Sequence, residues 1–95
     1  MNVGIIGSGG REHAICYMLS KSKKVSKIFC FPGNAGTSLI SQNVNLDPDN
    51  FSELEKHCIE KEIKLLVVGP EKPLVKGIVD HFKGKSIKVF GPDKI

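Results

Sequence analysis

The sequence has little cysteine, and none of it in a pattern that marks a metal or disulfide site. Its 95 residues contain three cysteines, Cys16, Cys30 and Cys58, which are odd in number and widely spaced. There is no C-x-x-C pair and no Cys/His spacing typical of zinc, and the three histidines are scattered. We therefore expect free thiols packed as small hydrophobes in a reducing compartment, and no metal site.

Long apolar runs and dense charge are also missing. No run approaches the ~20 residues that cross a bilayer, and no basic leader precedes the first apolar segment. The net charge is a mild +4, and the densest basic stretch, residues 21–27, has only Tyr17 and Phe29 near it. Nucleic-acid binding favours a basic face interleaved with aromatics. We expect a cytoplasmic protein without a membrane or nucleic-acid partner.

The length suits one small domain, and the apolar pattern alternates between strands and helices. Strands are predicted at residues 3–6, 25–31, 65–68 and 87–90, with an ambiguous short strand around Val44 and Leu46. Helices are predicted from Arg11 to about Lys21, from Asp49 or Asn50 onward, and from Pro73 to before Gly84. This order predicts an α/β fold: three layers, with a mainly parallel, Rossmann-like sheet and helices on both faces.

Several details of packing follow from the same pattern. The first helix is expected to face inward through Ala14, Ile15, Met18 and Leu19. Residues 65–68 are apolar without alternation, so we expect a strand buried on both faces. Asn50 followed by Glu53 resembles a capping box at the start of the second helix.

The most informative motif is GSGGREH, residues 7–13, directly after the first predicted strand. A strand, a glycine turn and a helix in succession form an anion site in parallel sheets. The glycines expose backbone N–H groups, and the helix start adds unpaired donors and the positive end of its dipole. The motif predicts a phosphate ligand.

Two common phosphate ligands fit poorly. A dinucleotide site requires G-x-G-x-x-G and an acidic residue about 20 positions on. Here Glu12 occupies the third glycine position, and Phe31 and Pro32 stand where the ribose-binding carboxylate belongs. The P-loop pattern G-x-x-x-x-G-K-[ST] is absent from the sequence.

The loops after three predicted strands offer a different set of groups. They are residues 7–13, 32–36 and 69–71, and in an open parallel sheet such loops meet at the ligand-binding edge. They carry backbone donors at Gly9 and Gly10, the Arg11 guanidinium, the Asn34 amide, and the carboxylates of Glu12 and Glu71. Donors suit a phosphate, and carboxylates suit sugar hydroxyls or an amine. The combination describes a sugar phosphate.

Each side chain also has a structural alternative. Glu12 is equally suited to complementing the helix N-terminus, Arg11 to pairing with a nearby carboxylate, and Asn34 to serving its own turn. Glu71 is also consistent with a solvated residue before a helix, and His13 with packing at the helix end.

The motifs together resemble those of the glycinamide ribonucleotide synthetase (phosphoribosylamine–glycine ligase) family. They are GSGGREHA at residues 7–14, PGNAGT at 32–37, VVGPEKPLVKGIVD at 67–80 and FGP at 90–92. The resemblance covers essentially the whole chain, with the four motifs in order. It implies the pre-ATP-grasp, N-terminal substrate-side domain of an ATP-grasp ligase of purine biosynthesis, spanning residues 1–95.

Enzymes of this family join 5-phosphoribosylamine to glycine with ATP and magnesium. The resemblance implies that Gly9, Gly10, Arg11 and Glu12 face the phosphoribosyl part, and that Asn34 and Glu71 approach its ribose or amine. The ATP-grasp and C-terminal domains of the family are absent from this sequence. ATP and magnesium are therefore expected to bind elsewhere in a parent enzyme, and we expect no tightly bound cofactor and no catalytic residue in this chain.

Three hypotheses about the chain remain open from the sequence. The first is the substrate-side domain of a longer ligase, inactive alone, whose partners are the remaining domains. Asp93, which follows Gly91-Pro92 and is placed like a helix N-cap two residues before the end of the sequence, favours this one. The others are a stand-alone sugar-phosphate binding module and a dinucleotide oxidoreductase domain.

Overall fold

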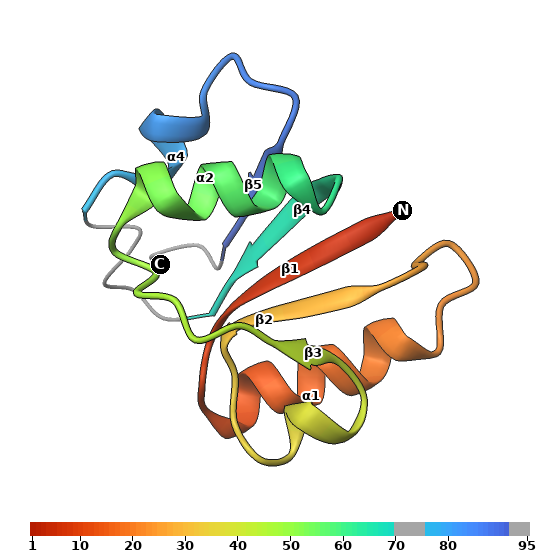
Figure 1. Cartoon of the computed structure of the whole chain (residues 1–95). Coiled ribbons are helices and arrows are strands. Elements are labelled where there is room, and N and C mark those ends of the chain that lie inside the picture. The colour runs from red at the N-terminus through yellow and green to blue at the C-terminus, as the bar shows by residue number, and fades with distance from the viewer. Residues whose placement is uncertain (70–75, 92–95) are drawn as a thin grey trace.

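The computed structural model describes residues 1–69 and 76–91. In chain order the elements are β1 (Asn2–Gly7), α1 (Gly10–Ser20), β2 (Ile28–Pro32), the short 3-10 helix η1 (Thr37–Leu39), β3 (Gln42–Asn43), α2 (Phe51–Glu60), β4 (Ile63–Val68), α4 (Ile78–Phe82) and β5 (Lys88–Phe90). The described strands form one parallel sheet in the order β3-β2-β1-β4-β5. Helices α2 and α4 cover one face and α1 the other (Figure 1). The predicted three-layer α/β fold is confirmed.

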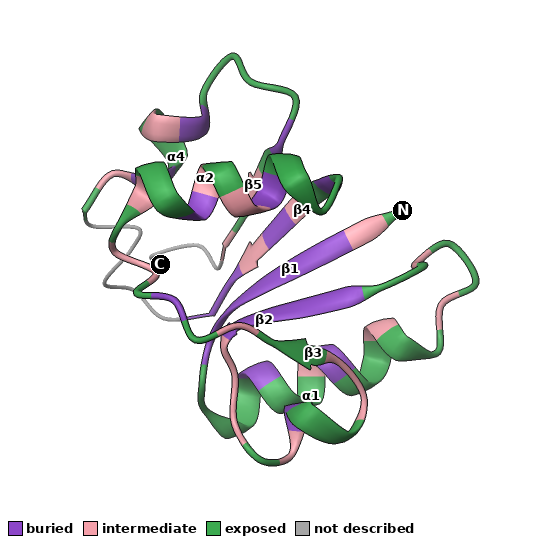
Figure 2. Ribbon diagram, viewed as in Figure 1, coloured by how far each residue is buried: buried purple, intermediate pink, exposed green. Residues whose placement is uncertain are grey.

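Alternation along the central strand divides the core between the two faces. On β1, Ile5 packs with Cys16 and Cys30 in a small cluster beneath α1. Its neighbour Ile6 faces the other way and joins Phe31 and Leu54 in the larger cluster beneath α2 and α4. Figure 2 shows β1 and β2 almost wholly buried along their paired length. Each such side chain contributes roughly 1.5–3 kcal/mol by leaving water.

The α1 face of the sheet is covered unevenly. Helix α1 lies across β1 and β2 and leaves β4 and β5 largely uncovered on that side (Figure 1). Leu66 and Val68 are buried on the α2 face, whereas Leu65 and Val67 are only half-buried. Opposite Val67 on the next strand, Phe90 is 65% exposed. The prediction of a strand buried on both faces is therefore wrong for β4.

Helix α1 has the predicted position but a different inward face. The predicted face included Ala14 and Met18, yet both are exposed, Met18 by 72%. The buried positions are Glu12 and Cys16, flanked by half-buried Ile15 and Leu19. Spacing of three and four residues places those positions on one side, and Met18 falls on the other. The face that meets the sheet thus contains a carboxylate and a thiol.

Two strand boundaries also differ from prediction. β2 begins at Ile28 and not at Val25, because Val25 donates its N–H to the Ser22 carbonyl (3.3 Å) in a preceding turn. The short strand lies at Gln42–Asn43 and not at Val44 and Leu46. Leu46 is buried in the larger cluster.

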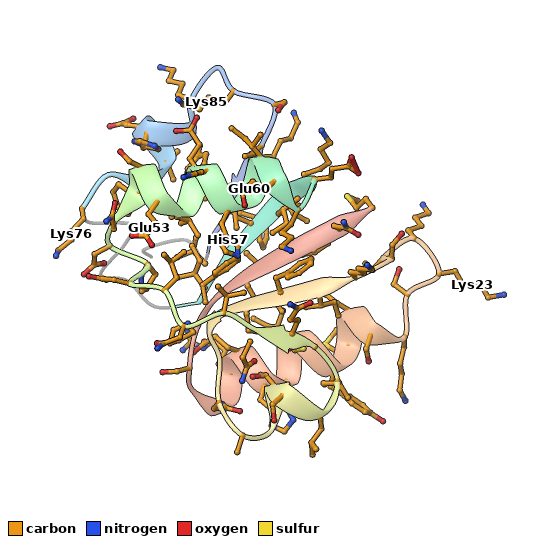
Figure 3. The ribbon with its side chains drawn as sticks, in the orientation of Figure 1. Lys23, Glu53, His57, Glu60, Lys76 and Lys85 are labelled. Atoms are coloured by element: carbon orange, nitrogen blue, oxygen red, sulfur yellow. The ribbon has the colours of Figure 1, made fainter. Side chains whose placement is uncertain are left out.

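Helix α2 begins where the capping pattern predicted. The Asn50 Oδ1 accepts the Glu53 backbone N–H at 3.2 Å, and the Asn50 amide donates to the Glu53 carboxylate at 3.1 Å. Further along α2, His57 lies against the sheet with its ring edge-on to Phe31, at 5.9 Å between centroids (Figure 3). The predicted start of the next helix, Pro73, lies outside the described residues. No helix of the described part is long and apolar enough to span a bilayer.

Candidate functional site

The glycine turn joins β1 to α1 at the carboxyl edge of the sheet. Gly7 ends β1 with φ at 135°, a conformation that side-chain-bearing residues rarely adopt. Gly9 is the N-cap of α1, and Gly10 is the first helical residue. The first N–H groups of a helix have no partner within it, so the N–H groups of Gly10 and Arg11 are not used by the helical ladder. The predicted strand-turn-helix motif is confirmed.

Glu12 folds back onto this turn. Its Oε1 accepts the Gly9 N–H at 2.8 Å, which is one half of a capping box. The other half of a capping box is a bond from the backbone N–H of the third helical residue to the N-cap side chain, and Gly9 has no side chain to accept it. The Glu12 side chain is 7% exposed and lies against Gly7 and Gly69, at the ends of β1 and β4. The charge also complements the helix dipole.

Arg11 lies on the exposed side of the same turn. Its Nη1 donates a long hydrogen bond of 3.4 Å to the Gly69 carbonyl. With Ile15, Val67 and Phe90 it also borders an apolar hollow of 120 Å³ on the uncovered part of the sheet. The guanidinium therefore lies between the glycine turn and the end of β4.

Asn34 ties the second loop to the glycine turn. Its amide Nδ2 donates to the carbonyl oxygens of Ser8 (2.9 Å) and Gly9 (3.3 Å). Its Oδ1 accepts the Thr37 N–H at 2.9 Å, and its own N–H donates to the Thr37 hydroxyl at 2.8 Å. Asn34 thus serves its own turn and also fixes that turn against the neighbouring loop.

Thr37 and Asn43 are structural members of this loop that the sequence reasoning missed. Thr37 is fully buried, and its hydroxyl bonds the Asn43 Oδ1 at 2.7 Å. Asn43 in turn donates to the Asn34 carbonyl at 2.8 Å. The Asn34–Thr37 spacing of three residues is the signal that could have found the first of them, since reciprocal side-chain to backbone bonds at that spacing are typical of Asx and ST turns.

His13 is exposed, and its ring lies against Gly36 in the second loop. A Cβ on Gly36 would lie 2.6 Å from the His13 Nδ1, so the imidazole occupies the space that a side chain at residue 36 would need. This placement agrees with the packing alternative for His13.

Five of the six predicted site residues therefore come from two adjoining loops. Gly9, Gly10, Arg11 and Glu12 are contiguous, and Asn34 reaches them through its hydrogen bonds to Ser8 and Gly9. Glu71 lies outside the described residues. Within the described ranges, no group of three or more His, Cys, Asp or Glu side chains is placed to hold a metal ion.

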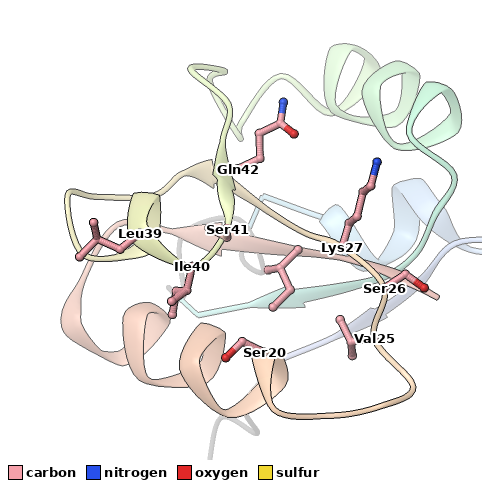
Figure 4. Close-up of a pocket in the computed structure, with 9 residues that line it drawn as sticks. Ser20, Val25, Ser26, Lys27, Leu39, Ile40, Ser41 and Gln42 are labelled. Atoms are coloured by element: carbon pink, nitrogen blue, oxygen red, sulfur yellow. The ribbon is translucent and has the colours of Figure 1, made fainter.

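A larger hollow of 430 Å³ lies at the opposite end of the sheet (Figure 4). It is formed by the end of α1, the segment before β2, and the chain from η1 to β3, and it is lined by Ser20, residues 25–28 and residues 39–42. None of the predicted site residues lines it. Its position at the amino ends of the strands separates it from the glycine turn.

Comparison with known proteins agrees with this architecture. The family described as "Phosphoribosylglycinamide synthetase, N domain" matches residues 1–95. This chain belongs to that family. It is 46% identical over 94 residues to the phosphoribosylamine–glycine ligase of Caldanaerobacter subterraneus subsp. tengcongensis, and 47% identical over 96 residues to that of Haemophilus influenzae. Each alignment covers 99% of this chain.

A solved structure of the phosphoribosylamine–glycine ligase from Thermotoga maritima has the same fold as this phosphoribosylglycinamide synthetase N domain. The TM-score is 0.59 and the sequence identity 32%, over 99% of this chain and 20% of that chain. The two curated relatives above are likewise matched over only 22% of their length. The chain thus spans about a fifth of the proteins it resembles.

Proposed function

We propose that this chain is the substrate-side domain of a phosphoribosylamine–glycine ligase, the enzyme that makes glycinamide ribonucleotide from 5-phosphoribosylamine, glycine and ATP in purine biosynthesis. The observation that carries the proposal is the junction of the glycine turn with the Asn34 loop, in a chain whose every described strand belongs to the family's N-domain fold. Its partners are then the small-molecule substrates and the remaining domains of the parent enzyme.

The geometry supports a phosphorylated sugar at this junction. The N–H groups of Gly10 and Arg11 start α1 and lie at the positive end of its dipole, where an anion is favoured. The Arg11 guanidinium is close by on the exposed side of the turn and adds a charge-assisted donor. Gly9, Glu12 and Asn34 adjoin these donors, and Glu71, which lies outside the described residues, is proposed to approach the ribose or amine.

The chemical step belongs to other parts of the parent. Phosphoryl transfer from ATP needs metal ions and cations around the transferred phosphate. The described residues hold no cluster of acidic and imidazole ligands that suits magnesium. We therefore assign ATP and magnesium to the remaining four-fifths of the enzyme, assign no catalytic residue to this chain, and expect the 95-residue chain to be inactive alone.

A cytoplasmic location fits the same proposal. Cys16, Cys30 and Cys58 are all free and buried. Free thiols of this kind are usual in a reducing compartment.

The test uses the full-length parent enzyme and Arg11→Ala. Wild type should release ADP only when both glycine and phosphoribosylamine are present, and the isolated 95-residue chain should release none. Loss of a charge-assisted phosphate contact costs about 1.5–3 kcal/mol, so the KM for phosphoribosylamine should rise by about tenfold or more while the KM for ATP stays within about twofold.

Lys23→Ala is the matched control, because it also removes one cation but lies in the turn beyond α1 (Figure 3). It should leave both KM values unchanged. A rise confined to the KM for ATP in Arg11→Ala would refute the placement of the sugar phosphate. Substrate-independent ATP turnover, or turnover by the 95-residue chain alone, would refute the assignment of roles between the domains.

A further inference from the structure

The Glu12 carboxylate packs against the backbone of three glycines, Gly7, Gly9 and Gly69. It is the third residue of α1, it is 7% exposed, and its side chain points back toward the start of the helix. Its Oε1 accepts the Gly9 N–H at 2.8 Å. A carboxylate removed from water needs such partners, because an unpaired buried charge is strongly destabilising.

Two glycines on different strands leave the space that this carboxylate fills. A Cβ on Gly7 would lie 2.6 Å from the Glu12 Cδ, and a Cβ on Gly69 would lie 2.6 Å from the same atom and overlap Oε2. Gly7 ends β1 and Gly69 follows β4, so the glycine turn and the end of β4 meet at the Glu12 side chain. The neighbouring Arg11 also reaches the Gly69 carbonyl, at 3.4 Å.

This packing of Glu12 determines which backbone N–H groups of the glycine turn can face a ligand. The Gly9 N–H is already used by the Glu12 carboxylate, so the backbone donors at the start of α1 that remain for an anion are those of Gly10, Arg11 and Glu12. A negative carboxylate beside a phosphate is unfavourable by itself. The packing of the Glu12 carboxylate between Gly7 and Gly69 gives it a structural role, and this role does not require contact with the sugar.

Resting on the function proposed above, we infer that Glu12 is a positioning residue. Its carboxylate, packed against Gly7 and Gly69, sets the distance between the glycine turn and Gly69 at the end of β4, and so orients the Gly10 and Arg11 donors toward the sugar phosphate. Glu12 does this through backbone contacts and does not bind the substrate.

Gly69 allows a sharp test of this role in the full-length enzyme. Gly69 has no positive φ that would strain a side chain, whereas Gly7 does, and the three atoms nearest to a Cβ on Gly69 all belong to the Glu12 side chain, so Gly69→Ala reduces the space available to Glu12. The experiment measures the unfolding temperature without substrate, and the KM values for phosphoribosylamine and ATP. The variants are Glu12→Gln, Glu12→Ala, Gly69→Ala and the double variant Glu12→Ala/Gly69→Ala.

The expected result has three parts. Glu12→Ala and Gly69→Ala each raise the KM for phosphoribosylamine by about tenfold, the effect of losing a hydrogen bond that involves a charged group, and leave the KM for ATP within about twofold. The double variant is no worse than Glu12→Ala, because the alanine methyl then has room. Glu12→Gln keeps an acceptor for the Gly9 N–H and stays within about threefold of wild type.

Other results would overturn the inference. If Glu12→Gln is as impaired as Glu12→Ala at an unchanged unfolding temperature, Glu12 binds the substrate through its charge. If the effects of Glu12→Ala and Gly69→Ala on the KM for phosphoribosylamine add in the double variant, the Glu12 carboxylate does not act through its contact with Gly69. If both KM values rise together, the contact is only structural.

The matched control is Glu53→Gln at the same third position of α2, where the carboxylate is exposed and bonded to Asn50. It should leave the KM for phosphoribosylamine unchanged. Failure of the proposed function is separately visible: wild type would then show no ligase turnover, while the unfolding temperatures of the four variants still report on the contact between Glu12 and Gly69.

Discussion

The Asn34 side chain donates a 2.9 Å hydrogen bond to the Ser8 carbonyl, which joins two loops that are 26 residues apart in the sequence. Neither loop belongs to a helix or strand at that point, so this bond and its 3.3 Å companion to the Gly9 carbonyl hold the first turn against the second. The Gly33 N–H also donates to the Gly7 carbonyl at 3.0 Å, so the Asn34 amide adds two side-chain hydrogen bonds to a backbone link between the loops. This relationship can be tested by substitution.

Asn34→Ala should lower the free energy of unfolding by about 1 kcal/mol, the net value of a hydrogen bond at a partly solvated position. It should also raise the KM for phosphoribosylamine in the full-length enzyme, because the two loops lose both side-chain hydrogen bonds that Asn34 makes between them. Urea unfolding and steady-state kinetics measure the two effects. Ser38→Ala is the control: its hydroxyl bonds the Ala35 carbonyl within the same loop, at 2.7 Å, and its removal should change neither value. An Asn34→Ala enzyme with wild-type kinetics would contradict the link between loop geometry and substrate binding.

Thr37→Val should cost about 1–3 kcal/mol although it preserves the shape of the side chain. The Thr37 hydroxyl is buried between Asn34 and Asn43, and its loss leaves the Asn34 N–H without its 2.8 Å acceptor. The shift of the urea midpoint relative to wild type measures the cost. Thr37→Ser keeps the hydroxyl and should retain most of the stability. Equal losses in the two variants would assign the effect to methyl packing.

Acid should weaken the contact between α2 and α4. Glu55 on α2 binds the Lys85 amine at 3.0 Å and the His81 imidazole at 2.9 Å, and these partners, Lys85 first, lower the pKa of its carboxyl from 4.5. A folded-state pKa below the unfolded one adds stability above the unfolded pKa, and that stability is lost as pH falls through the folded pKa. The difference in urea midpoint between wild type and Glu55→Gln should therefore be present at pH 7 and shrink below pH 4.5. A difference that is constant with pH would contradict the ion-pair contribution.

The buried thiols should be unreactive in the folded chain. Burial raises the pKa of Cys58 to about 12 and that of Cys30 to about 11. Because the thiolate is the reactive form, a disulfide reagent at pH 8 should label these cysteines only at the rate of unfolding. Because these pKa values are raised in the folded state, the contribution of the two neutral thiols to folding stability is fully present below 9.0, the pKa of an unfolded cysteine. That contribution is lost as pH rises through the folded-state values. Rapid labelling without denaturant would show that the sheet opens locally.

The alternation of strands and helices was predictable because it depends on local patterns. Apolar runs closed by glycine identified β1 and β4, and the Asn50–Glu53 spacing located the start of α2. Burial was harder to predict, because it depends on which elements cover which part of the sheet. Met18 looked like a core residue and is exposed, since α1 meets the sheet through Cys16 and Ile15.

For the candidate site, the sequence predicted which residues lie at the carboxyl edge of the sheet better than it predicted the contacts they make. Glycine, arginine and asparagine in loops after parallel strands pointed to the carboxyl edge, and the structure places Gly9, Arg11 and Asn34 there. The three-residue spacing between Asn34 and Thr37 could have identified the Thr37 turn, but the bond from its buried hydroxyl to Asn43 depends on how the loop folds. The packing of Glu12 against Gly69 depends on a contact between segments that are distant in the sequence, so spacing does not predict it.

The position of β1 in the centre of the sheet has a consequence for how the protein is made. β1, the first strand of this chain, is synthesised before its neighbours and pairs on one side with β2, through Val3 and Ile28, and on the other with β4, through Asn2 and Ile63. Its second edge therefore has no neighbour until more than sixty residues have been synthesised. Pairings of such long sequence separation slow folding and expose an unpaired edge meanwhile, so the nascent chain is most vulnerable to misassociation before β4 emerges.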